Sequence, residues 1–352
     1  MVSEASFKSI IKAYFPTEDR FKVKPLGDGN INDTYRLELG SNGFLLQKIN
    51  QSIFKEPQIV LENYQLIFQH LEVHLKDLLL PALIKTNNGQ LAYRNELGQY
   101  WRVLTFLEHT YGLESASDIQ QVAAAADATG RFLAALNQNP TPNLGTPLPD
   151  FHNFQQRYQS FLEALAKAKT ARKKAASEAI NFLMEWAPKI PNYHQLDLPQ
   201  RLVHNDPKIG NLLFNQQAQV VAVIDWDTIM PGTLLTDFGD MVRTMVATAG
   251  EDEADLDLVK INIDYFTALC QYFLPPLKPL LSALERQYWL SGAFYIVLEQ
   301  MLRFLQDYLQ EDIYYKIAYP EHNLVRAKNQ QALFQNLKHQ EAHLLRILKE
   351  VL

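Results

Sequence analysis

The chain has 352 residues, a length that predicts about two domains and provides enough material for a full hydrophobic core. Hydrophobic residues make up 47% of the chain and charged residues 20%, which excludes a wholly disordered protein. With 33 Lys and Arg against 39 Asp and Glu, the net charge of −6 disfavours a nucleic-acid partner, which requires clustered positive charge. The single cysteine, Cys270, excludes an internal disulfide and a thiolate zinc site.

The first residues and the apolar runs indicate no membrane partner. Residues 1–10 lack a basic region followed by an apolar stretch, so no secretory leader is expected. Apolar runs such as residues 78–84 are far shorter than a bilayer span. The sequence therefore predicts a cytoplasmic protein.

The first hundred residues predict a small, mostly antiparallel sheet with one helix. Apolar runs predict strands at residues 21–25, 34–39, 44–49 and 101–107. The Gly-Ser-Asn-Gly segment 40–43 predicts a hairpin between the second and third of these strands. Residues 57–75 have helical spacing, and a second hairpin is expected from runs 83–85 and 90–93 around residues 86–89.

The rest of the chain predicts a mainly helical second part. Helical spacing covers residues 117–137 and 151–187 and then nearly everything from 236 to the end. Residues 141–150 hold three prolines, so they are expected to form a surface loop. Short strands and loops are expected in residues 201–232.

One polar segment has the spacing that phosphoryl transfer requires. His204, Asp206 and Asn211 match the His-x-Asp-x-x-x-x-Asn pattern of a kinase catalytic loop, and Asp225 follows a second β-like run. Asp206 can orient an acceptor hydroxyl and take its proton, while Asn211 and Asp225 offer the oxygen ligands that Mg²⁺ prefers. The alternative is a polar turn in which these side chains bond locally to the backbone.

Longer motifs around this loop identify a family resemblance. The segments HNDPKIGN, VIDWDTIMPG and TDFGDMVRT resemble the aminoglycoside phosphotransferase/choline kinase superfamily, and most closely its N-acetylhexosamine 1-kinase branch. Further matching segments are GDGNINDTYRL near the start and RFLQDYLQEDIYYKIAYPEHNLVRA near the end. The resemblance implies an α+β, bilobal, protein-kinase-like fold. Residues 1–107 would be an N-lobe with an antiparallel sheet and one helix, and residues 108–352 a larger, mainly helical C-lobe.

The resemblance also implies where ATP would bind. Lys48 would reach the α- and β-phosphates and pair with Glu62 on the helix, although a solvated strand lysine is the alternative. Phe106, Leu107 and Glu108 would form the interlobe hinge beside adenine.

The turn that contains Gly27 and Gly29 would cover the ATP phosphates or touch the acceptor. It is a weak phosphate-loop signal, because Asn32 stands where a third glycine is expected, and a hairpin turn explains it equally well.

Four further polar residues near the loop have mainly structural interpretations. The resemblance implies that His204 braces the loop. Asp227 is either part of the metal shell or a salt-bridging or capping residue. Asp237 and Asp240 are expected to cap the N-terminus of a helix over residues 236–248.

Acceptor contacts are expected from the C-lobe. Arg303, Tyr314, Tyr319 and His322 lie in a stretch rich in aromatic rings and hydrogen-bond donors, which suits a sugar, although a helical core with a polar cap explains such residues too. The resemblance favours Arg303 and Tyr314 as sugar contacts.

The chain departs from the hexosamine kinase branch at two positions. Asn30 stands where the branch carries His, and Thr244 where it carries Phe. Both positions would lie near the sugar, so the departures concern its identity and leave phosphoryl transfer intact.

The combined interpretation is an ATP/Mg²⁺-dependent kinase that phosphorylates a sugar hydroxyl, with O1 of an N-acetylhexosamine as the expected position. One alternative is a kinase of an aminoglycoside, choline or homoserine, for which the acidic run 251–257 could supply a pocket, although a solvated helix start is the expected interpretation of that run. Another is a catalytically silent, nucleotide-binding kinase fold. The basic cluster within residues 167–174 is expected to be a solvated helix face. The predicted partner is a small-molecule acceptor, with neither nucleic acid nor membrane, and no oligomeric state is predicted.

Overall fold

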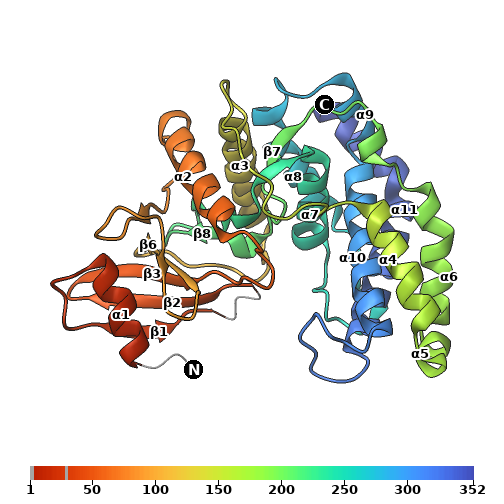
Figure 1. Ribbon diagram of the computed structural model, residues 1–352. Coiled ribbons are helices and arrows are strands. Elements are labelled where there is room, and N and C mark those ends of the chain that lie inside the picture. The colour runs from red at the N-terminus through yellow and green to blue at the C-terminus, as the bar shows by residue number, and fades with distance from the viewer. Residues whose placement is uncertain (1–3, 28–30) are drawn as a thin grey trace. The chain divides into compact units, whose positions relative to one another are not determined.

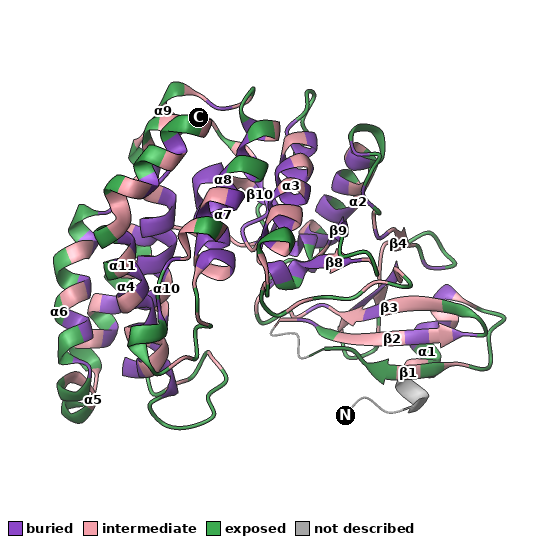
Figure 2. Cartoon of the chain, turned by 180° about the vertical axis from the view of Figure 1, so that it is seen from behind, coloured by how far each residue is buried: buried purple, intermediate pink, exposed green. Residues whose placement is uncertain are grey.

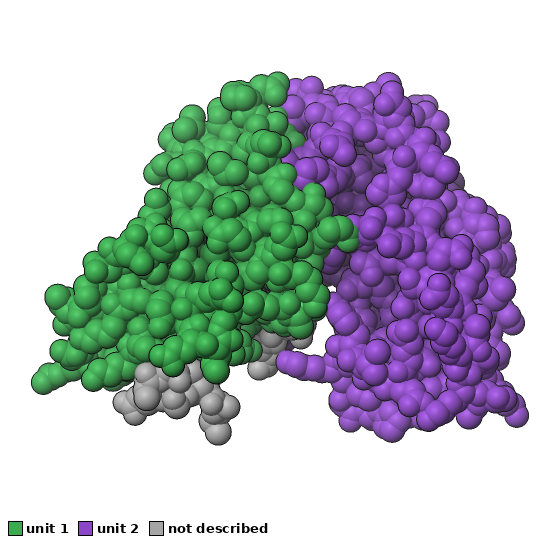
Figure 3. All heavy atoms as spheres, viewed as in Figure 1, with its two compact units in different colours: residues 1–111, 135–149, 213–230 green, residues 112–134, 150–212, 231–352 purple. Residues whose placement is uncertain are grey.

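The computed structural model describes residues 4–27 and 31–352. The chain divides into two units, each built from segments that are separate in the sequence (Figure 3). The first comprises Met1–Tyr111, Ala135–Pro149 and Leu213–Met230, and the second comprises Gly112–Ala134, Asp150–Leu212 and Pro231–Leu352. The first unit therefore contains the predicted N-lobe, residues 1–107, together with two segments from later in the chain.

An antiparallel sheet forms the body of the first unit (Figure 1). Its strands lie in the order β1 (Lys22–Pro25), β2 (Asp33–Leu39), β3 (Asn42–Lys48), β6 (Tyr100–Thr105) and β4 (Leu83–Ile84), with β5 (Tyr93–Arg94) also paired to β6. The hairpin between β2 and β3 is confirmed, because Gly40 takes a φ of 58° and Leu39 lies opposite Asn42. The predicted hairpin of residues 83–93 is wrong: the turn between Thr86 and Gln90 forms, but β4 and β5 pair with β6 and not with each other.

The sheet unit has a helix that the sequence analysis did not predict. α1 (Glu4–Tyr14) buries Ile10, Ile11 and Tyr14 against sheet residues that include Leu37 and Trp101. Apolar residues of α1 recur at helical spacing, so the signal was present in the sequence. The expected helix at 57–75 is confirmed as α2 (Pro57–His74).

Helices make up most of the second unit. Its longer helices are α3 (Ile119–Leu136), α4 (Phe154–Lys167), α6 (Ser177–Trp186), α7 (Leu234–Met241), α8 (Ile263–Leu277), α10 (Ser291–Leu309) and α11 (His322–Val351), and its shorter ones are α5 (Thr170–Ala175) and α9 (Ala283–Tyr288). The predicted helix at 151–187 is therefore three helices, and residues 247–262 and 310–321 interrupt the helical C-terminal part.

Short elements complete the chain. They are the strands β7 (Arg201–Val203), β8 (Leu212–Phe214), β9 (Val220–Val223) and β10 (Met230–Gly232), the 3₁₀ turns η1 (Ala187–Lys189), η2 (Tyr193–Gln195), η3 (Ile209–Asn211), η4 (Trp226–Thr228) and η6 (Leu256–Leu258), and the π-helical turn η5 (Val242–Val246). Among the residues that the structure describes, no helix has both the length and the apolar character needed to cross a bilayer.

The core of the second unit is centred on α10. This helix contacts α4, α7 and α11 and is buried along most of its length (Figures 1 and 2). α7 approaches α10 at two glycines: a Cβ added to Gly239 would lie 2.1 Å from the carbonyl oxygen of Gly292. A Cβ on Gly292 would lie 2.0 Å from the carbonyl oxygen of Leu235. This close approach fixes α7, which carries Asp237 and Asp240.

Candidate active site

The predicted catalytic loop lies between β7 and β8 and is fixed by its backbone. The amide nitrogens of His204 and Asn205 donate to the two carboxylate oxygens of Asp237 at 2.7 and 2.8 Å. His204 is fully buried, with its ring 6.2 Å from that of Phe132, which agrees with a bracing role. The expectation that Asp237 caps its own helix is wrong, since Thr233 is the N-cap of α7 and Asp237 instead holds the loop.

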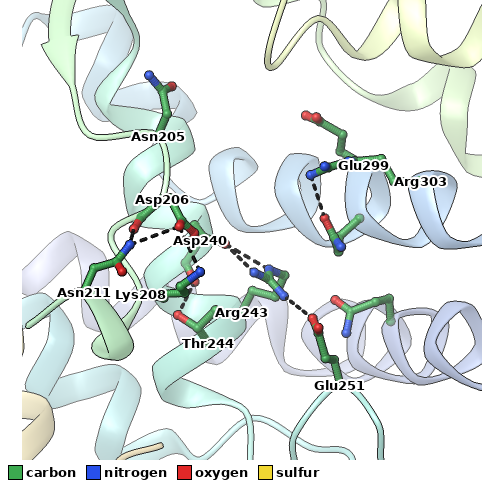
Figure 4. Close-up of polar contacts among 12 residues, drawn as sticks. Asn205, Asp206, Lys208, Asn211, Asp240, Arg243, Thr244, Glu251, Glu299 and Arg303 are labelled. Carbon is green, nitrogen blue, oxygen red and sulfur yellow. Dashed lines mark hydrogen bonds and ion pairs between the residues drawn. The ribbon is translucent and has the colours of Figure 1, made fainter. Parts of the chain in front are cut away.

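Asp206 and Asn211 are brought together by this loop (Figure 4). The Asn211 side-chain nitrogen donates to the Asp206 carbonyl at 2.8 Å and to its Oδ2 at 3.0 Å, and the Lys208 ammonium lies 2.9 Å from the same Oδ2. The Asp206 carboxylate thus contacts two donors, the Asn211 amide and the Lys208 ammonium, and is still partly exposed to solvent. Because the nitrogen of the Asn211 amide faces Asp206, its oxygen is turned the other way, as a ligand for a hard cation requires.

A second cluster of charges follows on α7 and η5. The Arg243 guanidinium binds Asp240 Oδ1, with Nε at 2.9 Å, and reaches Glu251 Oε2 at 3.0 Å. Burial lowers the pKa of Arg243, but nearby carboxylates outweigh this effect and raise it. The carboxylates are those of Asp240 and Glu251 and, more weakly, Asp206. The Thr244 hydroxyl donates to the Asp240 carbonyl at 2.8 Å. Asp240 therefore pairs with Arg243, and the expectation that it caps the helix is wrong.

Arg303 extends from α10 in the same close-up (Figure 4). Its guanidinium donates to Gln300 at 3.1 Å and lies over the Tyr315 ring at 5.7 Å. Burial opposes ionisation, but Tyr315 and Glu299 raise the pKa of Arg303, while the positive charge of Arg243 acts in the opposite direction.

Tyr314 is linked to Arg303 through Tyr315, the ring that both residues contact. The Tyr314 ring packs edge-on against Tyr315 at 4.8 Å and is exposed, and its backbone amide donates to the buried Asp307 at 2.8 Å. An exposed ring on an anchored backbone is suited to cover a ligand. Tyr319 and His322 belong to a different cluster, where the His322 ring stacks on Tyr319 and bonds to Asp252.

Asp225 and Asp227 lie in the first unit, at η4, and differ sharply in environment. Asp225 is exposed and takes a left-handed φ of 63°. Asp227 is buried and binds the Arg102 guanidinium at 2.6 and 2.8 Å, while the Asn32 amide donates to its Oδ2 at 2.8 Å. Gln47 accepts from the same guanidinium at 2.8 Å. The salt-bridge interpretation of Asp227 is therefore the one that the structure supports.

The predicted pair of Lys48 with Glu62 is wrong. Lys48 forms an ion pair with Asp33, its cross-strand neighbour on β2, and Glu62 accepts from Gln58 at 3.1 Å one turn earlier on α2. The physical reason is local, because Asp33 and Lys48 face each other in the β2–β3 register. The buried cation of the sheet is Arg102.

The other residues expected to contact ATP are Gly27, Gly29 and residues 106–108. Gly27, two residues after the end of β1, has a left-handed φ of 67°, while Gly29 and Asn30 lie outside the described residues. The segment 106–108 follows β6, and Arg36 binds the Glu108 carboxylate at 3.1 Å and lies 4.5 Å from the Phe106 ring centroid.

The two charged runs of the sequence are partly neutralised in the structure. In the basic cluster, Arg172 pairs with Asp312 at 2.7 Å and Lys169 pairs with Glu311, so these side chains anchor the segment that follows α10. In the acidic run, Glu251 pairs with Arg243 and Asp252 is bound by Arg326 at 2.6 Å.

Three residues of these clusters were not predicted by sequence reasoning. Lys208 lies inside the quoted catalytic motif, and Arg102 is a charged residue in an apolar strand run, so both carried a visible signal. Arg243 lies inside the quoted segment TDFGDMVRT, three residues after Asp240, so this pair was also visible, and only its contact with Glu251 depends on the fold.

An antiparallel-sheet unit, a helical unit and a loop that joins Asp206 to Asn211 define a protein-kinase-like small-molecule kinase. The chain belongs to the phosphotransferase enzyme family (APH), which its residues 22–267 match. It is therefore an enzyme that transfers a phosphoryl group to a hydroxyl of a small molecule.

Solved structures share this fold along almost the whole chain. A microcompartment-associated aminopropanol kinase has a TM-score of 0.64 at 14% identity, covering 97% of this chain and 99% of that one. An aminoglycoside phosphotransferase from Alicyclobacillus acidocaldarius subsp. acidocaldarius has a TM-score of 0.62 at 14% identity, covering 97% of each chain. A spectinomycin phosphotransferase in complex with ADP and spectinomycin has a TM-score of 0.58 at 14% identity, covering 99% and 98%.

Proposed function

We propose that this phosphotransferase is an ATP- and Mg²⁺-dependent kinase of a neutral sugar, with O1 of an N-acetylhexosamine as the acceptor hydroxyl. The observation that carries the proposal is the Arg303 guanidinium, which donates to the neutral amide of Gln300 at 3.1 Å and lies 5.7 Å from the centroid of the Tyr315 ring, against which Tyr314 packs. The charge of Arg243 is met by Asp240 and Glu251, whereas the Arg303 guanidinium can donate hydrogen bonds to sugar hydroxyls and disfavours a polycationic acceptor. The exposed ring of Tyr314 adds an apolar face of the kind that sugars use.

In the proposed reaction Asp206 orients the acceptor. Its carboxylate accepts the proton of the acceptor hydroxyl while the hydroxyl oxygen forms a bond to the γ-phosphorus of ATP. The bond between that phosphorus and the bridging oxygen breaks, and ADP leaves. The Lys208 ammonium, 2.9 Å from Asp206, places positive charge beside the reacting oxygens.

The metal would be held by the Asn211 amide oxygen and the Asp225 carboxylate. Both are hard oxygen donors that suit Mg²⁺, and the amide of Asn211 is already oriented by Asp206. When bound, Mg²⁺ supplies charge neutralisation on the phosphates.

The remaining predicted residues are proposed for the two substrates. Lys48, the turn with Gly27 and Gly29, and residues 106–108 would face the nucleotide. Lys48 would then exchange its partner Asp33 for a phosphate oxygen.

The acceptor would meet Arg303, Tyr314, Thr244 and Asn30. Because Thr244 and Asn30 are where the chain departs from the hexosamine kinases, these two positions are expected to decide which sugar is preferred.

A kinase of an amino alcohol or aminoglycoside is the second candidate. The exposed carboxylates of Glu251 and Asp252 favour it, since an ammonium acceptor needs negative charge. Against it, both carboxylates already bind arginines, namely Arg243 and Arg326.

The test is acceptor-dependent ADP release from ATP and Mg²⁺ with a panel of N-acetylhexosamines, other sugars, aminopropanol and aminoglycosides. The phosphorylated position of any product is then assigned by NMR. We expect turnover with an N-acetylhexosamine, a 1-phosphate product, and complete loss of turnover with EDTA. Turnover with the amines alone would replace the sugar proposal by the second candidate.

A further inference from the structure

His152 lies between two hydrogen-bond acceptors, just before α4. Its Nδ1 is 3.3 and 3.2 Å from the two carboxylate oxygens of Glu299 on α10. Its Nε2 is 3.3 Å from the carbonyl oxygen of Asn205, the residue that precedes Asp206. The ring therefore connects the middle of a buried helix to the catalytic loop.

The two contacts determine how many protons the ring carries. Carboxylate and carbonyl oxygens only accept hydrogen bonds, and a neutral imidazole has a single N–H group. His152 can serve Glu299 and Asn205 together only as an imidazolium. Deprotonation must break one of the two contacts.

Glu299 is built to remain ionised beside this ring. Its side chain is 2% exposed and also binds Arg157, whose Nε lies 2.9 Å from Oε1. Burial raises the pKa of the carboxyl, but His152 and Arg157, with a smaller effect of Arg303, outweigh it, so the pKa of Glu299 is lowered. Glu299 therefore presents an ionised acceptor to the Nδ1 of His152.

The segment that His152 holds is conformationally unfavourable. Asn205 has a left-handed φ of 66°, which is uncommon for a residue with a Cβ and persists where surrounding contacts enforce it. Its amide is held by Asp237 at 2.8 Å, and its carbonyl faces His152. The peptide that leads into Asp206 is thus fixed from both sides.

We propose that His152, in its doubly protonated form, is a positioning residue for Asp206 and acts through the carbonyl of Asn205. The inference rests on the proposed role of Asp206 as the base. When the ring loses its proton, the contact at the Asn205 carbonyl is lost and kcat falls. The affinities for nucleotide and acceptor stay the same, because His152 is placed to touch neither.

Other charged groups also surround the His152 ring, and one of them, Asp237, should change the loop with pH in the opposite direction to His152. Glu299 approaches from α10, Arg157 from α4 and Asp237 from α7, and the Tyr295 hydroxyl donates to the His152 carbonyl at 2.5 Å. Burial raises the pKa of Asp237 to about 7, against the two amides that it accepts. Because Asp237 binds those amides best when ionised, its titration weakens the loop as pH falls, whereas the titration of His152 weakens it as pH rises.

The kinetic test compares His152→Gln and His152→Ala with the parent over about pH 6 to about pH 9. His194→Gln, at an exposed histidine of the same unit, is the matched control. Glutamine keeps one donor for the Asn205 carbonyl but does not titrate. We expect the parent's decline of kcat at high pH to disappear in both variants. His152→Ala should lose about 10- to 100-fold in kcat at low pH, His152→Gln less, and neither should change KM.

A second arm needs no acceptor, so it separates this inference from the proposed function. With ¹⁵N-histidine and ¹³C-carbonyl labels, NMR follows the His152 ring and the Asn205 carbonyl during a pH titration. Two ring N–H groups at about pH 6, and a carbonyl shift that titrates with the ring, support the proposal. A neutral ring at that pH, or a parental kcat–pH profile in His152→Gln, overturns it.

Discussion

Arg102 and Asp227 form a charged pair with both side chains only 2% exposed. The carboxylate also accepts from Asn32, and the guanidinium also donates to Gln47, so the buried charges are well satisfied. Although burial opposes it, Asp227 raises the pKa of Arg102. Such a pair gives little net stability over an apolar replacement, but loss of one partner leaves an uncompensated buried charge.

We therefore predict that Asp227→Asn lowers the free energy of unfolding by about 3–5 kcal/mol. The double variant Arg102→Met/Asp227→Leu should recover much of this loss, because it leaves no buried charge. The free energy of unfolding in urea is measured for both variants. Lys12→Met, which removes the more exposed ion pair with Asp19, is the control. An unchanged stability in Asp227→Asn would contradict the burial of this pair.

The contact between α7 and α10 determines how well the catalytic loop is supported. Gly239 and Gly292 allow the two helices to approach until a Cβ has no room, and Asp237 on α7 binds the loop amides. A side chain at either glycine must push α7 away from α10, and overpacking of this kind costs about 1–3 kcal/mol or more.

We predict that Gly239→Ala lowers stability by at least that amount and also lowers kcat, because Asp237 moves with its helix. Gly250→Ala is the matched control, since no atom lies within 4 Å of the added Cβ. Thermal unfolding and kcat are measured on both. A Gly239→Ala protein with the parental melting temperature and kcat would show that the close approach is not required.

Elements with local signals could be predicted from the sequence, and those that depend on distant contacts could not. The β2–β3 hairpin, α2 and α3 follow from turn residues and spacing within one window. The pairing of β4 and β5 with β6 depends on tertiary contacts, so the turn between residues 86 and 90 suggested a false hairpin. α1 was missed although its spacing was visible.

The same division holds for the site. The spacing of Asp206 and Asn211 is local, and the structure joins them with a 3.0 Å hydrogen bond. The partners that position the loop come from far along the chain: His152 and Glu299 are 147 residues apart, and Asp237 lies 32 residues after Asn205. Nothing in one sequence indicates such pairs, because each depends on how the helices pack.

At the scale of the whole molecule, the proposed phosphoryl transfer depends on the Asp206 carboxylate. Asp206→Asn keeps the size and hydrogen bonding of the side chain but cannot accept the hydroxyl proton. It should therefore bind nucleotide normally. For parent and variant alike, ATP with Mg²⁺ at a hundred times Kd should stabilise the fold by about 2.7 kcal/mol.

The most direct test is kcat of Asp206→Asn with the acceptor identified from the panel, beside Asp197→Asn as an exposed control. We expect kcat to fall by about 100-fold or more while nucleotide-induced stabilisation persists, and the control to keep the parental kcat. A near-parental kcat in Asp206→Asn would contradict the assignment of the base and, with it, the proposed mechanism.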